Sequence, residues 1–200
     1  MNKEKRWIGF KDVVVIALLT ALSIVIQLVS GIPFAASPQL MMFASVAILM
    51  VICGPIYMLM MSKTPHKGAA VLYGAIQGIY YLILGQWIIG IVFFIGGIIS
   101  ECVLLGKGYQ KPLRIGAAYL VYAAFYPLAT YSPYLILADR YKVQLASAGL
   151  SQMAIDSIMD FYTSPVMIGL SVVCACICAA VGGFIGYKML QKHFKPAGVV

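Results

Sequence analysis

The sequence holds stretches without a charged residue that are too long for a water-soluble protein. No Asp, Glu, Lys or Arg lies between Asp12 and Lys63, and none lies from Gly68 to Ser100. A membrane-spanning helix needs about 20 mostly apolar residues and satisfies its backbone hydrogen bonds within itself. Only 10% of the chain is charged, against roughly 25% in soluble domains. The sequence therefore predicts a single all-helical membrane domain over residues 1–200.

Six membrane spans account for these stretches. Pro33 and Pro38 interrupt the first stretch near its middle, and Gly85 with Gln86 provides a tight turn in the second. The expected spans cover residues 12–31, 40–61, 68–84, 87–106, 115–138 and 164–187. Strands of a membrane β-barrel would alternate polar and apolar residues, and no segment does so. The prediction is an all-α bundle of six transmembrane helices.

Lysine and arginine are distributed unevenly between the two sides of such a bundle. One side receives twelve of them: Lys3, Lys5, Arg6, Lys11, Lys63, Lys67, Lys107, Lys111, Arg114, Lys188, Lys192 and Lys195. The other side receives Arg140 and Lys142. Because cytoplasmic loops are enriched in Lys and Arg, we expect a multi-pass protein of the bacterial plasma membrane with both termini in the cytoplasm. The net charge of +8 then reflects topology, and nucleic acid is not an expected partner.

The first span also has features of a secretory signal. A basic N-terminus precedes an apolar run, and the Phe-Ala-Ala-Ser sequence at 34–37 is similar to a cleavage site. The run from Val13 to Val29 is longer than a usual signal core, so we expect it to remain as a span. Cleavage is the alternative, and it would leave five spans with the N-terminus outside.

No feature of the sequence indicates catalysis, a cofactor or a metal site. The two histidines, His66 and His193, both fall at the cytoplasmic edge on different segments. The HExxH, GxSxG and phosphate-binding glycine motifs are absent. Cys174, Cys176 and Cys178 alternate between nearly opposite sides of a helix, which does not suit a metal site. We therefore expect a protein that is not an enzyme.

Glu101 is the one acidic residue deep within the apolar part of the chain. A carboxylate within the membrane is a functional candidate, yet Glu101 lies only a few residues before the basic loop that begins at Lys107. A hydrogen bond between helices, or pairing with a cytoplasmic Lys or Arg, is the simpler interpretation. Proton coupling is the alternative.

Aromatic and polar side chains gather in the expected outer halves of spans three to five and at the end of the outer segment. They are Gln77, Tyr80, Tyr81, Gln86, Trp87, Tyr126, Tyr131, Tyr134, Asp160 and Tyr162. Tyr and Trp are common at membrane interfaces simply because they are amphipathic, but Gln77 and Tyr126 fall deeper. Small-molecule sites are mostly apolar and aromatic with a few placed polar groups. We predict that these residues bind a planar, partly polar nutrient on the extracellular side.

The outer segment 139–163 contains a predicted amphipathic helix. Its apolar face comprises Leu150, Met153, Ala154, Ile158 and Phe161, and its polar row comprises Gln152, Asp156 and Asp160. Long ordered loops are often functional. The pattern fits a surface helix packed on the bundle and equally fits a lid over the pocket.

Ala17 and Ala21 form an AxxxA pattern that lets another helix approach the first span closely. With this pattern, six short spans and both ends inside, the chain resembles the substrate-binding S components of energy-coupling factor (ECF) transporters. Three further stretches resemble the Trep-Strep group of integral membrane proteins, which is S-component-like. They are Thr64–Ala69, Ser100-Glu101, and Gly106–Tyr109 before Arg114. The likeness covers about residues 8–190.

The resemblance implies a transport function. An S component captures a micronutrient from outside and associates with a transmembrane coupling protein and two cytoplasmic ATPases. ATP hydrolysis then makes it topple and release the substrate inside. The resemblance places Ala17 and Ala21 at the interface with the coupling protein, and the substrate among the pocket residues. The chain has no Walker motif, as expected of an S component, which does not hydrolyse ATP itself.

A stand-alone secondary transporter and a membrane scaffold are the alternatives. A secondary transporter usually shows internal repeats or several intramembrane charges, and a scaffold would bind no ligand. The sequence leaves the substrate open among vitamins, their precursors, queuosine-like bases and haem. Haem ranks below a vitamin-like compound because both histidines lie on the wrong side to ligate it.

Overall fold

The computed structural model describes residues 8–34 and 37–194. Most of these residues are helical, and none of them lies in a strand. The long helices are α1 (Phe10–Gly31), α3 (Val46–Lys63), α4 (Ala69–Ile83), α5 (Trp87–Leu104), α6 (Pro112–Ile136) and α9 (Pro165–Met189). Shorter helices are α2 (Pro38–Leu40), α7 (Ala138–Ser147) and α8 (Gln152–Thr163). Short 3-10 or π-helical segments occupy Ile32–Phe34, Met41–Ser45, Gly108–Gln110 and Leu190–Phe194. The predicted all-helical class is confirmed.

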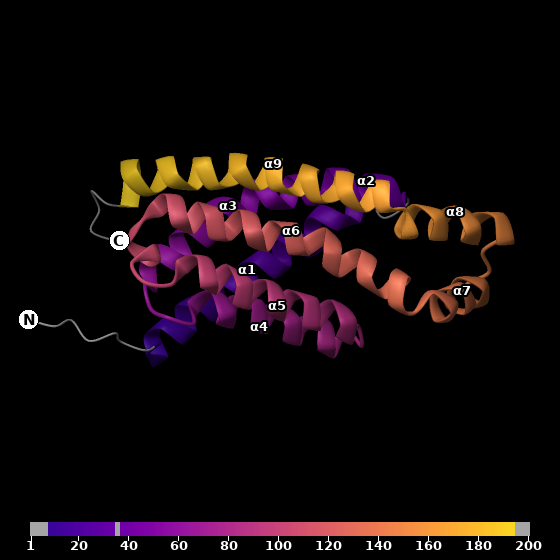
Figure 1. The fold of residues 1–200 in the computed structure, drawn as a ribbon, viewed down its shortest axis with the longest axis horizontal. Coiled ribbons are helices and arrows are strands. Elements are labelled where there is room, and N and C mark those ends of the chain that lie inside the picture. Colours follow the sequence, from indigo (N-terminus) through magenta and orange to yellow (C-terminus); the bar gives the residue numbers. More distant parts are fainter. Residues whose placement is uncertain (1–7, 35–36, 195–200) are drawn as a thin grey trace, which may run out of the picture.

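The long helices form one bundle in which successive helices run in alternating directions (Figure 1). α3 packs along α9, α5 lies between α4 and α6, and α6 also contacts α9. α1 packs against α3 and α4. α7 and α8 extend beyond one end of the bundle, opposite the end at which α1 begins and α9 finishes (Figure 1).

Among the described residues, four segments are long and apolar enough to cross a membrane: Phe10–Phe34, Pro38–Lys63, Trp87–Leu104 and Pro165–Lys192. A fifth results if α6 and α7 count as one span, although their axes differ by 84°. α4 has 15 residues, so it is about 22 Å long at ~1.5 Å per residue, less than the ~30 Å of bilayer hydrocarbon. The structure thus provides four to five candidate spans, where the sequence predicts six.

Large apolar side chains cover the outer surface of the long helices. Leu18 on α1 is 66% exposed, Phe94 on α5 is 43% exposed and Ile177 on α9 is 60% exposed. Soluble monomers rarely expose a continuous apolar surface of this extent, whereas lipid tails solvate it well. The arrangement supports a multi-pass membrane protein.

Glycines allow the closest contacts between helices. A Cβ atom added to Gly54 on α3 would lie 2.2 Å from the carbonyl carbon of Gly182 on α9. A Cβ atom added to Gly78 on α4 would lie 2.7 Å from the carbonyl oxygen of Gly90 on α5. Small residues favour helix association in membranes because they let the backbones approach. These residues therefore set the spacing of α3 against α9 and of α4 against α5.

α6 stays helical through Pro127 and Pro133 and then bends sharply. A proline removes the backbone donor that would bond to the carbonyl four residues earlier. For Pro133 that carbonyl belongs to Ala129, and the Ser132 hydroxyl donates to it at 2.8 Å. After Ile136 the chain turns by 84° into α7. The bend places α7 beside the turn between α4 and α5.

The outer segment forms two helices, α7 and α8, where the sequence predicts one. α8 is amphipathic, and along its polar row Gln152 Nε2 donates to Asp156 Oδ1 at 2.9 Å. The predicted apolar face is wrong at Leu150, which precedes α8, and at Met153, which is 83% exposed. The buried side chains of α8 are Ile155, Met159, Phe161 and Tyr162. The reason is that Phe161 and Tyr162 pack on Tyr131 of α6, which fixes the rotation of α8.

Basic residues lie mainly at the end of the bundle where α1 begins, which we call the basic end. Among the described residues it carries Lys11, Lys63, Lys67, Lys107, Lys111, Arg114, Lys188 and Lys192. The opposite end, which we call the α7–α8 end, carries Arg140 and Lys142. Lys3, Lys5, Arg6 and Lys195 lie outside the described residues, as do Ala35 and Ala36 of the cleavage-like sequence.

Candidate ligand-binding site

A cavity of about 440 Å³ lies among α1, α4, α6 and α8 near the α7–α8 end, and we call it the tyrosine cavity. Its polar and aromatic lining consists of Gln27, Ser45, Tyr80, Tyr81, Gln86, Tyr126, Thr130, Tyr134, Tyr141 and Tyr162. Its apolar lining includes Leu28, Ile32, Met41, Met42, Val46 and Ile89. Mostly apolar and aromatic walls with a few polar groups are typical of small-molecule sites.

Tyrosines from four helices shape this cavity. Tyr134 on α6 stacks on Tyr162 of α8, with ring centroids 4.0 Å apart and an interplanar angle of 7°. Tyr134 also contacts Tyr141 of α7 at 4.5 Å. α4 adds Tyr80 and Tyr81, whose rings meet edge to face at 5.1 Å. Aromatic faces that carry hydroxyl groups suit a flat, partly polar ligand.

The polar groups of the tyrosine cavity are neutral. Gln27 on α1 donates a hydrogen bond from Nε2 to the hydroxyl of Tyr81. Burial raises the pKa of Tyr162, and burial likewise raises the pKa of Tyr141 although the Arg140 guanidinium opposes it. Both hydroxyls therefore stay protonated at neutral pH. Within the described part of the chain, no Asp, Glu, Lys, Arg or His lines the cavity.

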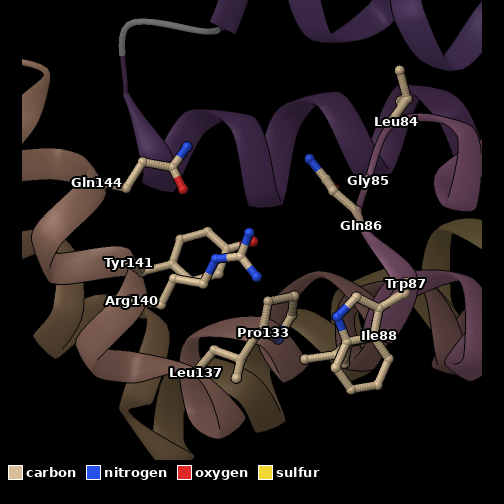
Figure 2. A pocket seen from close by; sticks show the side chains of 10 residues that line it. All are labelled: Leu84, Gly85, Gln86, Trp87, Ile88, Pro133, Leu137, Arg140, Tyr141 and Gln144. Atoms are coloured by element: carbon tan, nitrogen blue, oxygen red, sulfur yellow. The ribbon is translucent and has the colours of Figure 1, made fainter.

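A second pocket of about 280 Å³ adjoins the tyrosine cavity, and we call it the Arg140 pocket (Figure 2). It lies between the α4–α5 turn and the bend from α6 to α7, and it shares Gln86, Pro133 and Tyr141 with the cavity. Figure 2 shows Arg140 reaching from α7 into this pocket beside Tyr141. Gly85, with φ +76, forms the tight turn that places Gln86 at the border of the two spaces.

The structure brings together six of the ten pocket residues predicted from the sequence. Tyr80, Tyr81, Gln86, Tyr126, Tyr134 and Tyr162 line the tyrosine cavity. Trp87 lines the Arg140 pocket. Gln77 is buried beside a neighbouring void of about 10 Å³, and its Oε1 has no hydrogen-bond partner among the described residues. A void of this size holds at most one water molecule, so Gln77 lies next to the candidate site but does not line it.

Tyr131 and Asp160 lie away from both spaces. Tyr131 is fully buried, and its hydroxyl shares a hydrogen bond of 2.8 Å with Ser171 Oγ on α9. Its ring packs on Phe161 and Tyr162, so it holds α8 against α6 and α9. Asp160 lies on the exposed face of α8. These positions suit a structural role for Tyr131 and a solvated carboxylate at Asp160.

The sequence-based prediction leaves out several residues that line these spaces, among them Gln27, Arg140 and Tyr141. Gln27 carries an amide within the apolar first span. Polar side chains in a membrane span usually face the interior of the bundle or a cavity. Arg140 and Tyr141 follow the end of α6 closely. Only the bend after Ile136 places them beside the α4–α5 turn, and no sequence pattern indicates that bend.

Comparison with known proteins identifies the family. The family model described as "hypothetical bacterial integral membrane protein (Trep_Strep)" matches residues 10–195. The chain belongs to the Trep_Strep family. Searches of the curated proteins and of the solved structures found no match. The family and the apolar helices agree on a multi-pass membrane protein.

In this Trep_Strep protein, Glu101 connects the three stretches that resemble the Trep-Strep group in the sequence analysis. Glu101 is buried, and its Oε1 accepts the N–H of Gly68 at 2.9 Å. Its Oε2 accepts the N–H of Ala70 at 3.1 Å and the hydroxyl of Tyr109 at 2.5 Å. A carboxylate at a helix N-terminus satisfies N–H groups that lack a partner within the helix. Glu101 therefore makes hydrogen bonds between helices, and among the described residues no Lys or Arg lies within ion-pair distance of it.

The loop between α3 and α4 also contacts the start of α1. His66 Nδ1 lies 2.9 Å from Asp12 Oδ2, which is ion-pair distance, although the direction is not that of a hydrogen bond. Asp12 Oδ2 accepts the N–H of Gly9 as well. In the segments 8–34 and 37–194, no three His, Cys, Asp or Glu side chains gather closely enough to hold a metal ion.

The surface of α1 around Ala17 and Ala21 is open in this Trep_Strep chain. Ala21 is exposed, Ala17 is half-buried, and Leu18 beside them is 66% exposed. Because α1 begins at the basic end, Ala17 lies in the half of the helix nearer that end and Ala21 lies at its middle. This face is accessible to lipid or to a partner helix, and it is separated from the tyrosine cavity along the bundle.

Proposed function

We propose that this Trep_Strep protein is the substrate-capturing S component of an ECF transporter. The observation that carries the proposal is an uncharged tyrosine cavity at one end of a membrane bundle whose basic residues concentrate at the other. Since Lys-rich and Arg-rich loops face the cytoplasm in most membrane proteins, the cavity faces the extracellular side. A planar, vitamin-like micronutrient is the ligand in this proposal.

Six spans with both termini in the cytoplasm complete the proposal. Successive long helices alternate between the basic end and the α7–α8 end, and α4 takes part in this alternation despite its length (Figure 1). A short hydrophobic helix is accommodated by local thinning of the bilayer or by its neighbours, at a modest free-energy cost. α4 is well supported by neighbours, since it packs against both α5 and α1.

The driving force for uptake comes from partners in this proposal. As in the S components that the sequence resembles, a transmembrane coupling protein and two cytoplasmic ATPases supply it. The face of α1 that carries Ala17 and Ala21 suits the coupling protein, because small side chains let a second helix approach at short distance. Its exposure in this chain is consistent with such a contact.

Replacing Ala17 and Ala21 together with Trp tests the proposal. We expect the variant to keep the small molecule that co-purifies with the protein, identified by mass spectrometry, because the cavity lies toward the opposite end. We expect it to lose co-purification of the coupling protein and ATPases, and to lose uptake, since overpacking a tight contact costs roughly 1–3 kcal/mol per site. Ile177→Trp, on the lipid-exposed surface of α9, is the matched control and should change neither.

The competing functions give different results in the same assay. A stand-alone secondary transporter would take up substrate in cells that lack the ATPases. A scaffold would carry no co-purifying ligand at all. If the double Trp variant folds, binds and still supports normal uptake, the ECF proposal is wrong.

A further inference from the structure

The two adjoining spaces near the α7–α8 end differ in their electrostatic character. The tyrosine cavity has an uncharged lining, whereas the Arg140 pocket carries one cation. Gln86, Pro133 and Tyr141 border both, so one small molecule can occupy the two spaces together. A ligand that matches them has an uncharged part and a part of opposite charge to arginine.

Arg140 is exposed at the pocket and has no acidic partner among the residues that the structure describes. Among the described residues, no Asp or Glu lies within ion-pair distance of it, and none lines its pocket. Asp139 precedes it in the chain, but that side chain does not border the pocket. The guanidinium group presents parallel N–H donors that match a carboxylate or a phosphate in a bidentate contact. Its chemistry therefore selects an anion.

Two further features of the Arg140 pocket favour an anion. Gln86 and Gln144 border it, and each amide can supply N–H donors to anionic oxygens. α5 begins at Trp87, and no side chain caps its first N–H groups. These groups carry partial positive charge. They add to the charge of Arg140 from the other side of the pocket.

The tyrosine cavity accepts the other part of the ligand. Its tyrosine rings offer flat faces for stacking, and its hydroxyl and amide groups offer neutral hydrogen bonds. A charge placed among them would lose hydration without gaining a partner of opposite sign. An uncharged ring system is the chemistry that this lining accepts.

We infer that the ligand of this protein is a flat, uncharged ring system that carries one anionic group, with the ring in the tyrosine cavity and the anion on Arg140. The anion is a carboxylate or a phosphate. This inference names the substrate class of the proposed S component and so rests on that function for its biological meaning. The binding preference itself concerns the purified protein alone.

Matched pairs of probes test the inference. Benzoate, naphthoate and anthroate carry one, two and three rings with a carboxylate, and benzamide, naphthamide and anthramide are their uncharged counterparts. Binding is measured by isothermal titration calorimetry at low salt on the full chain in lauryl maltoside, whose headgroup is a neutral sugar. For at least one pair we expect the carboxylate to bind about tenfold more tightly than the amide, as a charge-assisted hydrogen bond would give.

Variants of Arg140 assign the preference to the pocket. Arg140→Gln should reduce carboxylate affinity to that of the amide and leave amide affinity unchanged, while Arg140→Lys should retain part of the preference. Lys142→Gln removes a cation from the same helix, at a residue that borders neither space, and should change nothing. The inference is overturned if no pair favours the carboxylate, if no probe binds, or if Arg140→Gln leaves the preference intact.

A phospholipid headgroup offers the same phosphate chemistry as a soluble ligand. Adding phosphatidylglycerol to the micelles separates the two sources. We expect carboxylate binding to persist, because the ring and the anion are held together. If phosphatidylglycerol displaces the carboxylates from the wild type, Arg140 is a lipid site and the inference falls. The Ala17 and Ala21 experiment is unaffected by any of these results, so the failure of either proposal is recognisable by itself.

Discussion

Tyr131 and Tyr134 lie three residues apart on α6, and both contact Tyr162, yet their surroundings differ. Tyr134 lines the tyrosine cavity and stacks on Tyr162. Tyr131 is fully buried and shares a hydrogen bond with Ser171. The sequence predicts both as ligand contacts, because tyrosines near a membrane interface look alike in a pattern. Which of them faces a cavity depends on how α8 packs, and that contact is not local in the sequence.

Substituting these two tyrosines separates binding from structure. Tyr134→Ala should weaken binding of the co-purifying ligand roughly tenfold or more, since a buried aromatic contact contributes about 1–3 kcal/mol. Tyr131→Phe should leave affinity unchanged and lower the unfolding free energy by about 1 kcal/mol through the lost hydrogen bond. Calorimetric titration and thermal unfolding measure the two effects. Equal affinity in the wild type and Tyr134→Ala would contradict the cavity assignment.

Glu101 provides a second test at the level of a single residue. Glu101→Gln keeps the shape of the side chain but leaves only one oxygen to accept bonds from Gly68, Ala70 and Tyr109. A buried donor without an acceptor costs about 1–3 kcal/mol, so the unfolding temperature in detergent should fall. Asp156→Asn, on the exposed face of α8, is the matched control. A variant as stable as the wild type with impaired uptake would favour proton coupling.

At the level of elements, charge-free runs and turn residues locate most helices well. The turn at Gly85, the start of α5 at Trp87 and the helix over Pro165–Met189 all follow from such patterns. The sequence does not show where α6 ends. Its apolar run continues toward Ala138 without a break, whereas the structure bends at Leu137. The pairing of α3 with α9 is likewise invisible, because the contact joins residues far apart in the chain.

The contact between α3 and α9 predicts a strong effect of a single methyl group. A Cβ atom on Gly182 would lie 2.4 Å from the carbonyl oxygen of Met50 and 2.8 Å from that of Val51. Gly182→Ala should therefore lower the unfolding free energy by roughly 1–3 kcal/mol, the usual cost of overpacking. Gly169→Ala lies on the same helix and meets nothing within 4 Å. Thermal unfolding of the two variants should differ clearly, and a similar shift in both would show that helix propensity dominates.

At the level of the whole molecule, the sequence predicts the class of protein and the end at which the candidate site is expected. The uneven distribution of Lys and Arg points to one orientation, and the tyrosine cavity lies at the end with few basic residues. The shape of the cavity is not predictable in the same way. It depends on the α6–α7 bend and on the rotation of α8, which tertiary contacts determine.

Cysteine labelling tests the orientation. In a variant that lacks the five native cysteines, a cysteine at Ser147 should react with an impermeant thiol reagent added to intact cells, and so should one at Ala36, which lies outside the described residues. Cysteines at Lys63 and Lys111 should react only after the membrane is opened. Labelling of the Lys111 position in intact cells would show that the six-span topology is wrong.

The separation of charge to the two ends of the bundle has an electrical consequence. Among the described residues, Glu101 is the one buried charged side chain, and it lies near the basic end. A potential of 100 mV does about 2.3 kcal/mol of work on each elementary charge that crosses the membrane. The buried part of the bundle therefore offers that field little charge to act on. An anion carried inward would move against the negative interior, so ATP hydrolysis by the proposed partners would have to supply that work for every molecule imported.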